Sequence, residues 1–392
     1  MQNQTRWGHG HGSGGAFLLA SLAGIFKAGV MHLAQLRLRD FRNYERLDVA
    51  FVPGFHVLLG DNAQGKTNIL EAIYLLATLR SFRGVGSAQL IRHGHKHYFV
   101  GATVVAQTSH EIKMYWSASE RKLSLSGQPV RRLSDYLGVL RTVVFCTEDL
   151  QLVKGPGTVR RRFMDLLLVQ TFPQYLPLLQ RYAALLRSRN ALLKQRRIDE
   201  TALEGFTRGL VAAGNEIMRM RSTLLPQIAP LAKAAYARIS QKNEVFDLQY
   251  LPAVKENFSK ELERQKDRER ILRMTVTGPH RDELLLNLDG RPAAKFASEG
   301  QKRSIAIALK MTQAEHLASV HGTPPILLID DIMGELDAKR RAGFLPLLNR
   351  SQHAQSQVFM TCTEENWPRE FSRDLNHWEV KNGTIKRLQT VP

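Results

Sequence analysis

Hydrophobic and polar residues alternate along several stretches of the chain. Residues 35–39 and 47–51 place leucine, valine or phenylalanine at every second position, between polar or small side chains. A period of two is typical of β-strands with one buried face, so we expect two antiparallel strands joined through residues 40–45. Residues 98–125 show a similar strand-like pattern, which predicts an antiparallel meander.

Four shorter runs are apolar almost throughout. They are residues 55–59, 141–147, 325–332 and 357–363. Such runs indicate strands that are buried on both faces, as in the middle of a sheet that other layers cover.

Helical spacing dominates the middle of the chain. Apolar residues recur every three or four positions in residues 163–193, and residues 199–239 and 259–274 continue in the same style. We therefore expect a helical insertion over residues 157–275, which separates an α/β unit into residues 31–156 and 276–392. Two further helices are predicted, at residues 68–82 and 304–320.

One loop between a predicted strand and a predicted helix carries a specific motif. It matches the pattern G-x-x-x-x-G-K-[ST] of the nucleotide phosphate-binding loop. Its residues are Gly60, Asp61, Asn62, Ala63, Gln64, Gly65, Lys66 and Thr67. The glycines let backbone N–H groups face an anion, Lys66 adds a positive charge, and Thr67 offers a hydroxyl to Mg²⁺. The loop predicts a bound nucleoside triphosphate with Mg²⁺.

Composition narrows the class of partner. The chain has 392 residues, 43% of them hydrophobic, and a formal net charge of +19. This excess favours a polyanionic partner, most simply nucleic acid, although a basic proteome is an alternative. The two cysteines, Cys146 and Cys362, form no C-x-x-C pair, which indicates a reducing, cytoplasmic setting without a zinc site. We expect no membrane-spanning segment.

Residues 1–30 differ in kind from the rest. They are rich in glycine and histidine, contain no acidic residue and include a short apolar run at residues 16–26. This run is too short to span a bilayer, and a signal peptide conflicts with an ATP-binding loop. We expect a disordered extension or a start assigned too early, with Met31 as the true first residue.

Two acidic residues end the apolar run that begins at residue 325. Asp330 and Asp331 match the Walker B pattern. In that pattern the first carboxylate holds Mg²⁺, and the second orients and polarises the water that attacks the γ-phosphate. A helix N-cap is the simpler alternative for two acids after a strand.

A second anion site is predicted at the start of the helix that follows residue 297. Ser298, Gly300 and Gln301 lie there, and helix N-termini favour anions. In ATPases of the ABC class such a signature loop contacts the γ-phosphate held by the other subunit. Residues 334–337 resemble the D-loop that crosses the same interface. Phosphate loop, signature, Walker B and D-loop occur in the order of that class, so we expect an ATP-dependent homodimer.

These motifs and several neighbouring segments resemble the RecF family of bacterial recombination-mediator ATPases. The segments are LRLRDFRNYERL (36–47), GDNAQGKTNILEAIYLLATLRSFR (60–83), VVFCTEDLQLVKGPGTVRRRFMDLLL (143–168), RSRNALLK (187–194), TGPHRDEL (277–284), SEGQKRSIAIALK (298–310) and PILLIDDIMGELDAKRR (325–341). The resemblance implies an α/β fold: a P-loop ABC-type ATPase head with a mixed sheet, related to SMC-type heads. Residues 157–275 would form a short helical arm inserted into this head, in place of a long coiled coil.

The same resemblance implies a function. ATP and Mg²⁺ would be the cofactors, and ATP would drive dimerisation on single- and double-stranded DNA at gaps or junctions. Weak DNA-stimulated hydrolysis would reset the dimer. The family cooperates with RecR and RecO to load recombinase onto SSB-coated single strands during recombinational repair and replication restart.

A few positions depart from these patterns or stay open. Asp331 stands where ABC-class ATPases generally have glutamate, and its shorter side chain reaches the attacking water less well. Gly334 replaces a serine that is common in the family's D-loop. No histidine directly follows the last predicted central strand, so the role of the switch histidine of ABC-class ATPases is either missing or filled by Thr361 or Thr363. Glu148 is a further candidate near the metal.

Basic residues concentrate at the start of the predicted arm, where residues 160–197 contain nine lysines and arginines against one acid, Asp165. They are Arg160, Arg161, Arg162, Arg181, Arg187, Arg189, Lys194, Arg196 and Arg197. We expect contacts with the phosphate backbone of DNA and no base readout. For the triplet Arg160–Arg162, the alternative is that it braces the arm against the head, for example by pairing with Glu148 or Asp149.

Two other functions compete with the mediator hypothesis. A P-loop kinase or nucleotide transferase would need a lid and an acceptor site, and it leaves the signature loop and the basic charge unexplained. An ATP-gated DNA scaffold with incidental hydrolysis would share every motif. DNA-stimulated release of phosphate separates both from the mediator.

Overall fold

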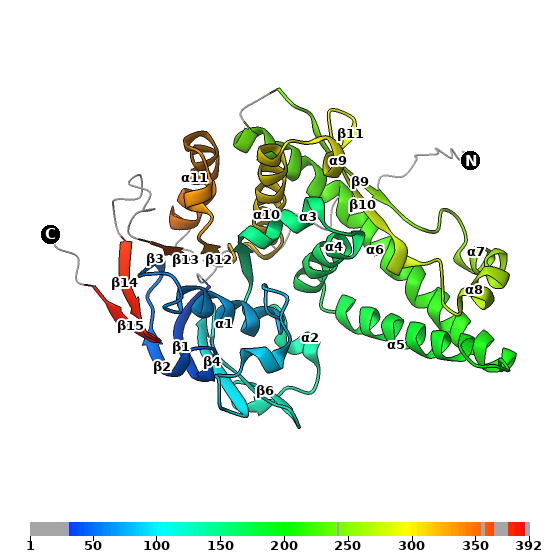
Figure 1. Ribbon diagram of the computed structural model, residues 1–392, viewed down its shortest axis with the longest axis horizontal. Coiled ribbons are helices and arrows are strands. Elements are labelled where there is room, and N and C mark those ends of the chain that lie inside the picture. The colour runs from blue at the N-terminus through cyan, green and yellow to red at the C-terminus, as the bar shows by residue number, and fades with distance from the viewer. Residues whose placement is uncertain (1–30, 241–242, 354–356, 364–374, 389–392) are drawn as a thin grey trace, which may run out of the picture.

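The computed structural model describes residues 31–240, 243–353, 357–363 and 375–388 (Figure 1). The extension expected at residues 1–30 lies outside these residues. The described part forms three β-sheets and eleven α-helices.

A mixed six-stranded sheet carries the nucleotide motifs. Its order is β15-β14-β3-β13-β12-β8, in which only β15 runs antiparallel to its neighbour. The strands are β3 (Gly54–Leu59), β8 (Thr142–Phe145), β12 (Ile326–Asp330), β13 (Gln357–Cys362), β14 (Leu375–Lys381) and β15 (Thr384–Arg387). The four apolar runs of the sequence correspond to β3, β8, β12 and β13, so these predictions are confirmed.

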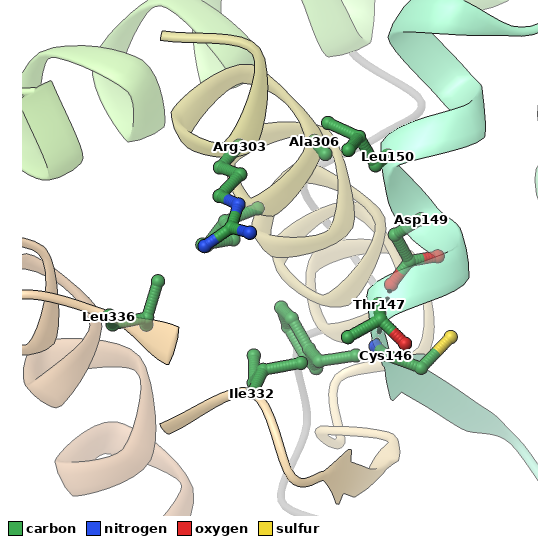
Figure 2. Close-up of a pocket in the computed structure, with 10 residues that line it drawn as sticks. Cys146, Thr147, Asp149, Leu150, Arg303, Ala306, Ile332 and Leu336 are labelled. Atoms are coloured by element: carbon green, nitrogen blue, oxygen red, sulfur yellow. Dashed lines mark hydrogen bonds between the residues drawn. The ribbon is translucent and has the colours of Figure 1, made fainter. Parts of the chain in front are cut away.

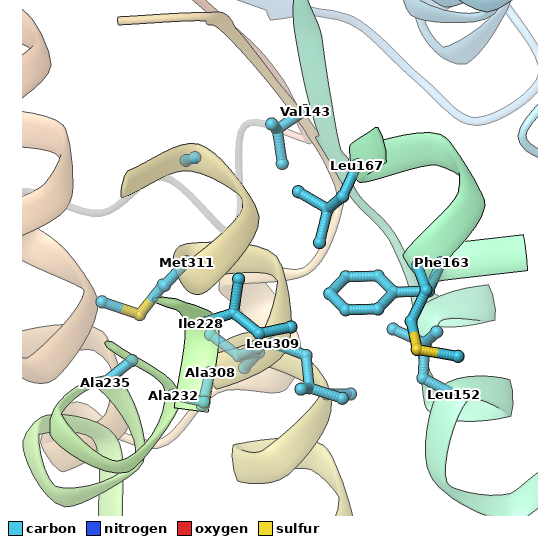
Figure 3. Packing of buried hydrophobic residues seen from close by; sticks show 14 of the residues in the cluster. Val143, Leu152, Phe163, Leu167, Ile228, Ala232, Ala235, Ala308, Leu309 and Met311 are labelled. Atoms are coloured by element: carbon cyan, nitrogen blue, oxygen red, sulfur yellow. The ribbon is translucent and has the colours of Figure 1, made fainter. Parts of the chain in front are cut away.

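Alternate side chains of these strands enter two different cores. In β12, Leu327 and Ile329 belong to one hydrophobic cluster and Ile326 and Leu328 to another. Figure 3 shows part of the first cluster, where Val143 of β8 packs with helical residues. Because both faces of the sheet are covered, the central strands are apolar almost throughout.

A second sheet, which is antiparallel, packs against α1 (Lys66–Thr78). Its order is β2-β1-β4-β5-β6-β7. The strands are β1 (His32–Phe41), β2 (Tyr44–Ala50), β4 (His97–Val105), β5 (Ser109–Ser117), β6 (Arg121–Leu125) and β7 (Gln128–Pro129). Leu36 pairs with Val49 and Leu38 with Leu47, so the predicted hairpin is confirmed, as is the predicted meander. The buried face of this sheet packs with α1 and the central strands.

The helices lie mainly on the other face of the central sheet and in the arm. They are α1 (Lys66–Thr78), α2 (Leu133–Tyr136), α3 (Gln151–Lys154), α4 (Gly157–Thr171), α5 (Tyr175–Leu193), α6 (Glu200–Ser240), α7 (Phe258–Arg264), α8 (Lys266–Leu272), α9 (Ala293–Phe296), α10 (Glu299–His321) and α11 (Ala338–His353). Short 3₁₀ turns are η1 (Ser87–Leu90), η2 (Thr147–Leu150), η3 (Pro279–Arg281) and η4 (Met333–Glu335).

The long helix α6 joins the arm to the head. At 41 residues it is about 60 Å long. It packs against α5 in the arm and against α10 and α11 beside the central sheet. Figure 3 shows Ile228, Ala232 and Ala235 of α6 close to α10.

One strand interrupts the helical segment expected over residues 157–275. β9 (Phe246–Leu251) pairs antiparallel with β10 (Glu283–Leu288), which also pairs with β11 (Arg291–Pro292). The description of this segment as helical is therefore incomplete. Phe246, Leu248 and Tyr250 alternate with exposed or half-buried residues, a signal that was available in the sequence but only six residues long.

Candidate nucleotide site

The phosphate-binding loop connects β3 to α1 with two glycines in backbone conformations that other residues rarely adopt. Gly60 has φ 147° and Gly65, the N-cap of α1, has φ 116°. A Cβ on Gly60 would lie 2.3 Å from the carbonyl oxygen of Val380, and one on Gly65 would lie 2.6 Å from Nδ2 of Asn43. Both positions therefore require glycine.

Residues of neighbouring segments donate hydrogen bonds to this loop. Asn43 Nδ2 donates to the carbonyl oxygen of Gln64 (2.9 Å), and the Tyr44 hydroxyl donates to that of Gly65 (3.1 Å). The backbone N–H of Asn382 donates to Oε1 of Gln64 (2.7 Å). Burial raises the pKa of Tyr44, so its hydroxyl remains a donor. The turn at residues 40–45, predicted only as a connection, thus positions the loop.

Lys66 lies at the centre of the loop. Its Nζ donates to the carbonyl oxygens of Gly60 (2.5 Å) and Asp61 (2.8 Å). Burial lowers the pKa of the Lys66 ammonium, and the charges of Asp331 and Asp330 oppose this shift. The lysine therefore lies between the loop and the carboxylates of Walker B.

A cavity of about 640 Å³ opens above the loop. Its lining includes Asn62, Ala63, Gly65, Lys66 and Thr67 from the loop, together with Asp331 and Thr361. This volume lies within the range of about 300–1,000 Å³ that is usual for ligand sites. The cavity is therefore large enough for a nucleoside triphosphate.

Asp330 is the point at which the loop and the central strands meet. Its Oδ1 accepts hydrogen bonds from the hydroxyls of Thr67 (2.7 Å) and Thr361 (2.9 Å). Thr361 lies opposite Asp330 in the parallel pair of β12 and β13. Thr67 and Asp330 thus offer two oxygen ligands side by side, a donor set that fits Mg²⁺ together with phosphate oxygens.

Several charges act on Asp330. Burial raises its pKa, whereas the hydroxyls of Thr67 and Thr361 and the charge of Arg83 lower it, and the charge of Glu148 raises it. Arg83 and Glu148 are therefore close enough to influence the site.

Asp331 differs from its neighbour in exposure and conformation. Its side chain is exposed, it lines the cavity, and its φ of 53° is left-handed. The backbone N–H of Asp331 donates to the Thr361 hydroxyl (3.0 Å). A non-glycine residue in this region is strained, and such strain is common at functional sites. The strand thus turns sharply after Asp330 and presents the second carboxylate to the cavity.

The rim of this cavity is polar, and its residues were not predicted as site residues from the sequence. Arg42, Asn68, Arg83 and His93 all line it. The guanidinium of Arg42 forms two hydrogen bonds of 2.8 Å with the buried carboxylate of Glu71, which holds it beside α1. Arg42, Asn68 and Arg83 lie in segments 36–47 and 60–83, which carry the family resemblance, whereas nothing in the sequence pointed to His93.

The signature residues lie apart from this cavity on the same protomer. Ser298 Oγ accepts from the backbone N–H of Gln301 (3.2 Å), and Gln301 Oε1 accepts from the backbone N–H of Ser298 (2.6 Å). Ser298 is exposed at the start of α10, and neither it, Gly300 nor Gln301 is among the residues that line the cavity. The structure therefore joins the phosphate loop to Walker B but not to the signature.

Contacts within the protomer connect the signature helix to the D-loop. Arg340 donates to Asp337 Oδ2 (2.6 Å) and to the Ser304 hydroxyl (3.0 Å), and it packs against Gly300. A smaller cavity beside α10 has a volume of about 160 Å³. Figure 2 shows Arg303 of α10 and Leu336 of the D-loop facing one another among its lining residues. The signature and the D-loop thus form one connected surface.

The structure corrects the expectation for part of the basic segment. Arg189 is buried, and its guanidinium donates to Glu269 (2.6 Å), Thr275 (2.8 Å) and Thr207 (2.9 Å). Its assignment as a DNA contact is therefore wrong, because a side chain engaged inside the arm cannot reach a phosphate. A single charge on a helix does not reveal in the sequence whether it faces inward.

Two members of the arginine triplet brace the arm, as the alternative proposed, but with other partners. Arg160 pairs with Glu283 (2.8 Å), and Arg161 donates to the carbonyl oxygen of Asp282 (2.7 Å). The suggested partners Glu148 and Asp149 are not used by these two residues. The arginines and lysine that stay exposed are Arg162, Arg181, Arg187, Lys194, Arg196 and Arg197.

Within the described residues, no helix combines the length and apolar character that crossing a membrane would need.

Known proteins resemble this chain over nearly its whole length. A family model described as the RecF/RecN/SMC N terminal domain matches residues 32–386. The DNA replication and repair protein RecF of Symbiobacterium thermophilum is 37% identical over 371 residues, covering 91% of this chain and 98% of that protein. The protein of the same name from Lactococcus lactis subsp. cremoris is 37% identical over 360 residues, covering 91% and 99%.

Solved structures of known proteins also resemble this chain. The recombination mediator protein RecF-ATP in the RecFOR pathway is 28% identical, with a TM-score of 0.84 over 92% of this chain and 99% of that chain. An Smc head domain from Pyrococcus furiosus, 16% identical over 92% of this chain and 96% of that chain with a TM-score of 0.54, shares the fold. The chain has the fold of an ABC-type ATPase head with an inserted arm, and it belongs to the RecF family.

Proposed function

We propose that this protein is an ATP-dependent DNA-binding protein of recombinational repair and replication restart, active as an ATP-bound homodimer. The observation that carries the proposal is the separation of two half-sites. The phosphate loop and Walker B are joined within one protomer, whereas Ser298 is exposed at the start of α10 outside their cavity. A second copy placed head to head would supply the missing signature.

Each site residue then has a role. Gly60 to Gly65 present backbone N–H groups to the phosphates, and Lys66 binds and orients the γ-phosphate. Thr67 and Asp330 would hold Mg²⁺, which when bound neutralises charge on the phosphates. Asp331 accepts a hydrogen bond from the attacking water and polarises it. Because Asp331 is one methylene shorter than glutamate, we expect slow hydrolysis.

The signature would close the site across the dimer. Ser298, Gly300 and Gln301 would approach the γ-phosphate held by the other protomer, through the N-terminal N–H groups of α10. Hydrogen bonds from Arg340 to Ser304 and Asp337 support a signature and D-loop that move together. ATP thus stabilises the dimer, and hydrolysis releases it.

We assign residues 31–156 and 276–392 to the ATPase head and residues 157–275 to the arm. DNA at gaps or junctions would contact the exposed basic residues of α5 and the turn after it, through phosphates. Relatives named DNA replication and repair protein support this role, and a solved relative placed in the RecFOR pathway supports RecO and RecR as partners. We place the protein in the cytoplasm, where ATP and DNA are available.

Light scattering of the purified protein tests the proposal. We expect the mass of a monomer with ADP, a dimer with ATP, and a dimer on DNA with ATP and gapped DNA. Lys66→Ala serves as the control and should remain monomeric in ATP. A monomer under all conditions would contradict the proposal. A P-loop kinase would instead transfer phosphate to an acceptor, without stimulation of phosphate release by DNA.

A further inference from the structure

Another large cavity, separate from the two described above, opens where the arm meets the head. It has a volume of about 430 Å³ and shares no lining residue with the nucleotide site. α4 and α5 form most of it, and α6, η3, the end of α1 and the segments after α1 and α2 complete it. We call it the junction cavity. Its volume lies within the range of about 300–1,000 Å³ that is usual for ligand sites.

The wall of the junction cavity is aliphatic. Leu166 of α4 and Leu176, Leu179 and Leu186 of α5 line it, and each is only half-buried. They therefore leave apolar surface open to an occupant, at the base of helices whose opposite faces are packed. Burying such surface against an apolar group would stabilise a complex.

Two arginines at the junction cavity form no hydrogen bond or ion pair through their guanidinium groups with the residues that the structure describes. Arg80, which follows α1, and Arg162 of α4 are both exposed, and in the described part of the chain neither guanidinium makes a hydrogen bond or an ion pair. Burial and the charge of Arg162 lower the pKa of Arg80, so the two positive charges repel one another across the cavity.

The only acid among the lining residues cannot neutralise them. Asp165 already accepts hydrogen bonds from Arg221 (2.9 Å) and from the hydroxyl of Tyr175 (2.5 Å). The junction cavity therefore combines an apolar wall with an uncompensated positive charge. An occupant that carries both carboxylates and a large apolar group would satisfy both features.

We propose that the junction cavity binds an acidic peptide segment of a partner protein, with a large apolar side chain seated among the leucines and carboxylates on Arg80 and Arg162. A nucleic acid strand fits less well, because bases are usually held by stacking on aromatic rings. The tyrosines that line the cavity, Tyr74 and Tyr182, are buried, and the Tyr182 hydroxyl is bonded to Nδ1 of His280 (2.7 Å). This site does not depend on the proposed ATP-driven dimer.

Occupation of the junction cavity would also reach the nucleotide site. Arg80 comes directly after the C-cap residue of α1, and Lys66 and Thr67 form the first turn of the same helix. A peptide that fixes Arg80 therefore contacts the far end of the helix that carries the phosphate-binding lysine. A partner bound in the junction cavity would therefore act on the ATP site through α1.

Fluorescence anisotropy of a labelled synthetic peptide tests the proposal. The probe has a run of aspartates followed by leucine and phenylalanine. One control peptide replaces the apolar pair with serines, and a second replaces the aspartates with asparagines. The protein variants are Arg80→Glu with Arg162→Glu, Leu179→Glu, and the matched control Arg268→Glu, an exposed arginine of α8 outside the cavity. Thermal melts establish that each variant is folded.

We expect the probe to bind more tightly than either control peptide. The double arginine variant and Leu179→Glu should each weaken binding about tenfold or more, and Arg268→Glu should leave it nearly unchanged. Equal binding of the probe and the serine peptide would overturn the proposal, because it would reflect only the basic net charge. Loss of single-stranded oligonucleotide binding without loss of probe binding in the double arginine variant would also overturn it, since the cavity would then belong to the DNA surface.

Discussion

Thr67 and Asp330 are 263 positions apart in the chain, yet the hydroxyl of Thr67 donates to Oδ1 of Asp330 across 2.7 Å. This bond brings the first turn of α1 to the end of β12. Thr67 and Asp330 would hold the Mg²⁺ that the motifs predict. The affinity of this site for Mg²⁺ should therefore depend on the charge of Asp330 more than on the shape of its side chain.

We predict that Asp330→Asn weakens Mg²⁺-dependent ATP binding by about tenfold or more and prevents the ATP-dependent dimer, because the amide lacks the negative charge that Mg²⁺ requires. Calorimetric titration with and without Mg²⁺ measures this. Asp48→Asn, an exposed aspartate of β2, is the matched control. If Asp330→Asn keeps the full Mg²⁺ dependence of the wild type, the assignment is wrong.

Asp331→Asn should behave differently, because Asp331 is exposed in the cavity and the Thr67 hydroxyl donates to Asp330 instead. We expect ATP binding and dimer formation to persist while hydrolysis slows by about 10²–10³-fold, since the amide cannot polarise the attacking water. Single-turnover phosphate release and the lifetime of the complex on gapped DNA are measured together. Slower release with an unchanged lifetime would show that something other than hydrolysis opens the dimer.

Ser298→Arg should separate nucleotide binding from dimerisation. A bulky cation at the start of α10 would occupy the position of the partner's γ-phosphate, while the cavity on the same protomer has no contact with Ser298. We expect unchanged ATP affinity and a monomer in sedimentation velocity with ATP. Ser119→Arg, an exposed serine between β5 and β6, is the control. A surviving dimer would count against a signature that acts across subunits.

The basic residues of the arm should divide into two classes. Replacing Arg187, Lys194, Arg196 and Arg197 with alanine should weaken DNA binding and make its salt dependence shallower, by about one unit per lost phosphate contact. The free energy of unfolding should change little, because these residues are exposed. Binding titrations at several salt concentrations measure the slope, and an unaltered slope would remove these residues from the DNA surface.

Arg189→Ala should instead destabilise the fold. Arg189 and Glu269 form an ion pair of 2.6 Å in which both side chains are buried. Removing the arginine leaves the carboxylate of Glu269 buried and unpaired, which costs about 3–5 kcal/mol. Urea denaturation measures this loss, and a variant as stable as the wild type would contradict the structural role.

His56 should make stability depend on pH. Burial lowers its pKa to about 4, and its Nδ1 accepts a hydrogen bond from Trp378 Nε1 (3.0 Å), so the folded protein holds the ring neutral. The unfolded chain takes up the proton near pH 6.5, before the folded state does. The free energy of unfolding should therefore fall as pH drops from about 6.5 to about 4.

Urea denaturation at about pH 7.5 and about pH 5 tests this expectation. His56→Asn should be less stable at the higher pH, because it loses ring packing against Phe359, but it should lose less on acidification than the wild type. The difference between the two proteins isolates His56 from other histidines. An equal loss in both would exclude His56 as the source.

The sequence by itself determined the elements and motifs that depend on neighbouring residues. Period-two patterns located β1, β2 and the meander, and apolar runs located four central strands, because strand geometry places alternate side chains on opposite faces. The phosphate loop was readable because its glycine conformations and its lysine lie within eight consecutive residues. Asp330 and Asp331 followed from the strand that precedes them.

Only the tertiary structure decided which distant residues share a site. The cavity rim of Arg42 and Arg83 depends on where the turn between β1 and β2 and the segment after α1 pack. The inward position of Arg189 depends on how α5 packs against its neighbours. The junction cavity likewise needs α4, α5, α6, η3, the end of α1 and the segments after α1 and α2 to converge around Arg80 and Arg162. The physical reason is that a charged residue fits the same sequence pattern whether its side chain lies on an exposed helix face or in a buried ion pair. Burial and partner, which only packing supplies, distinguish the two.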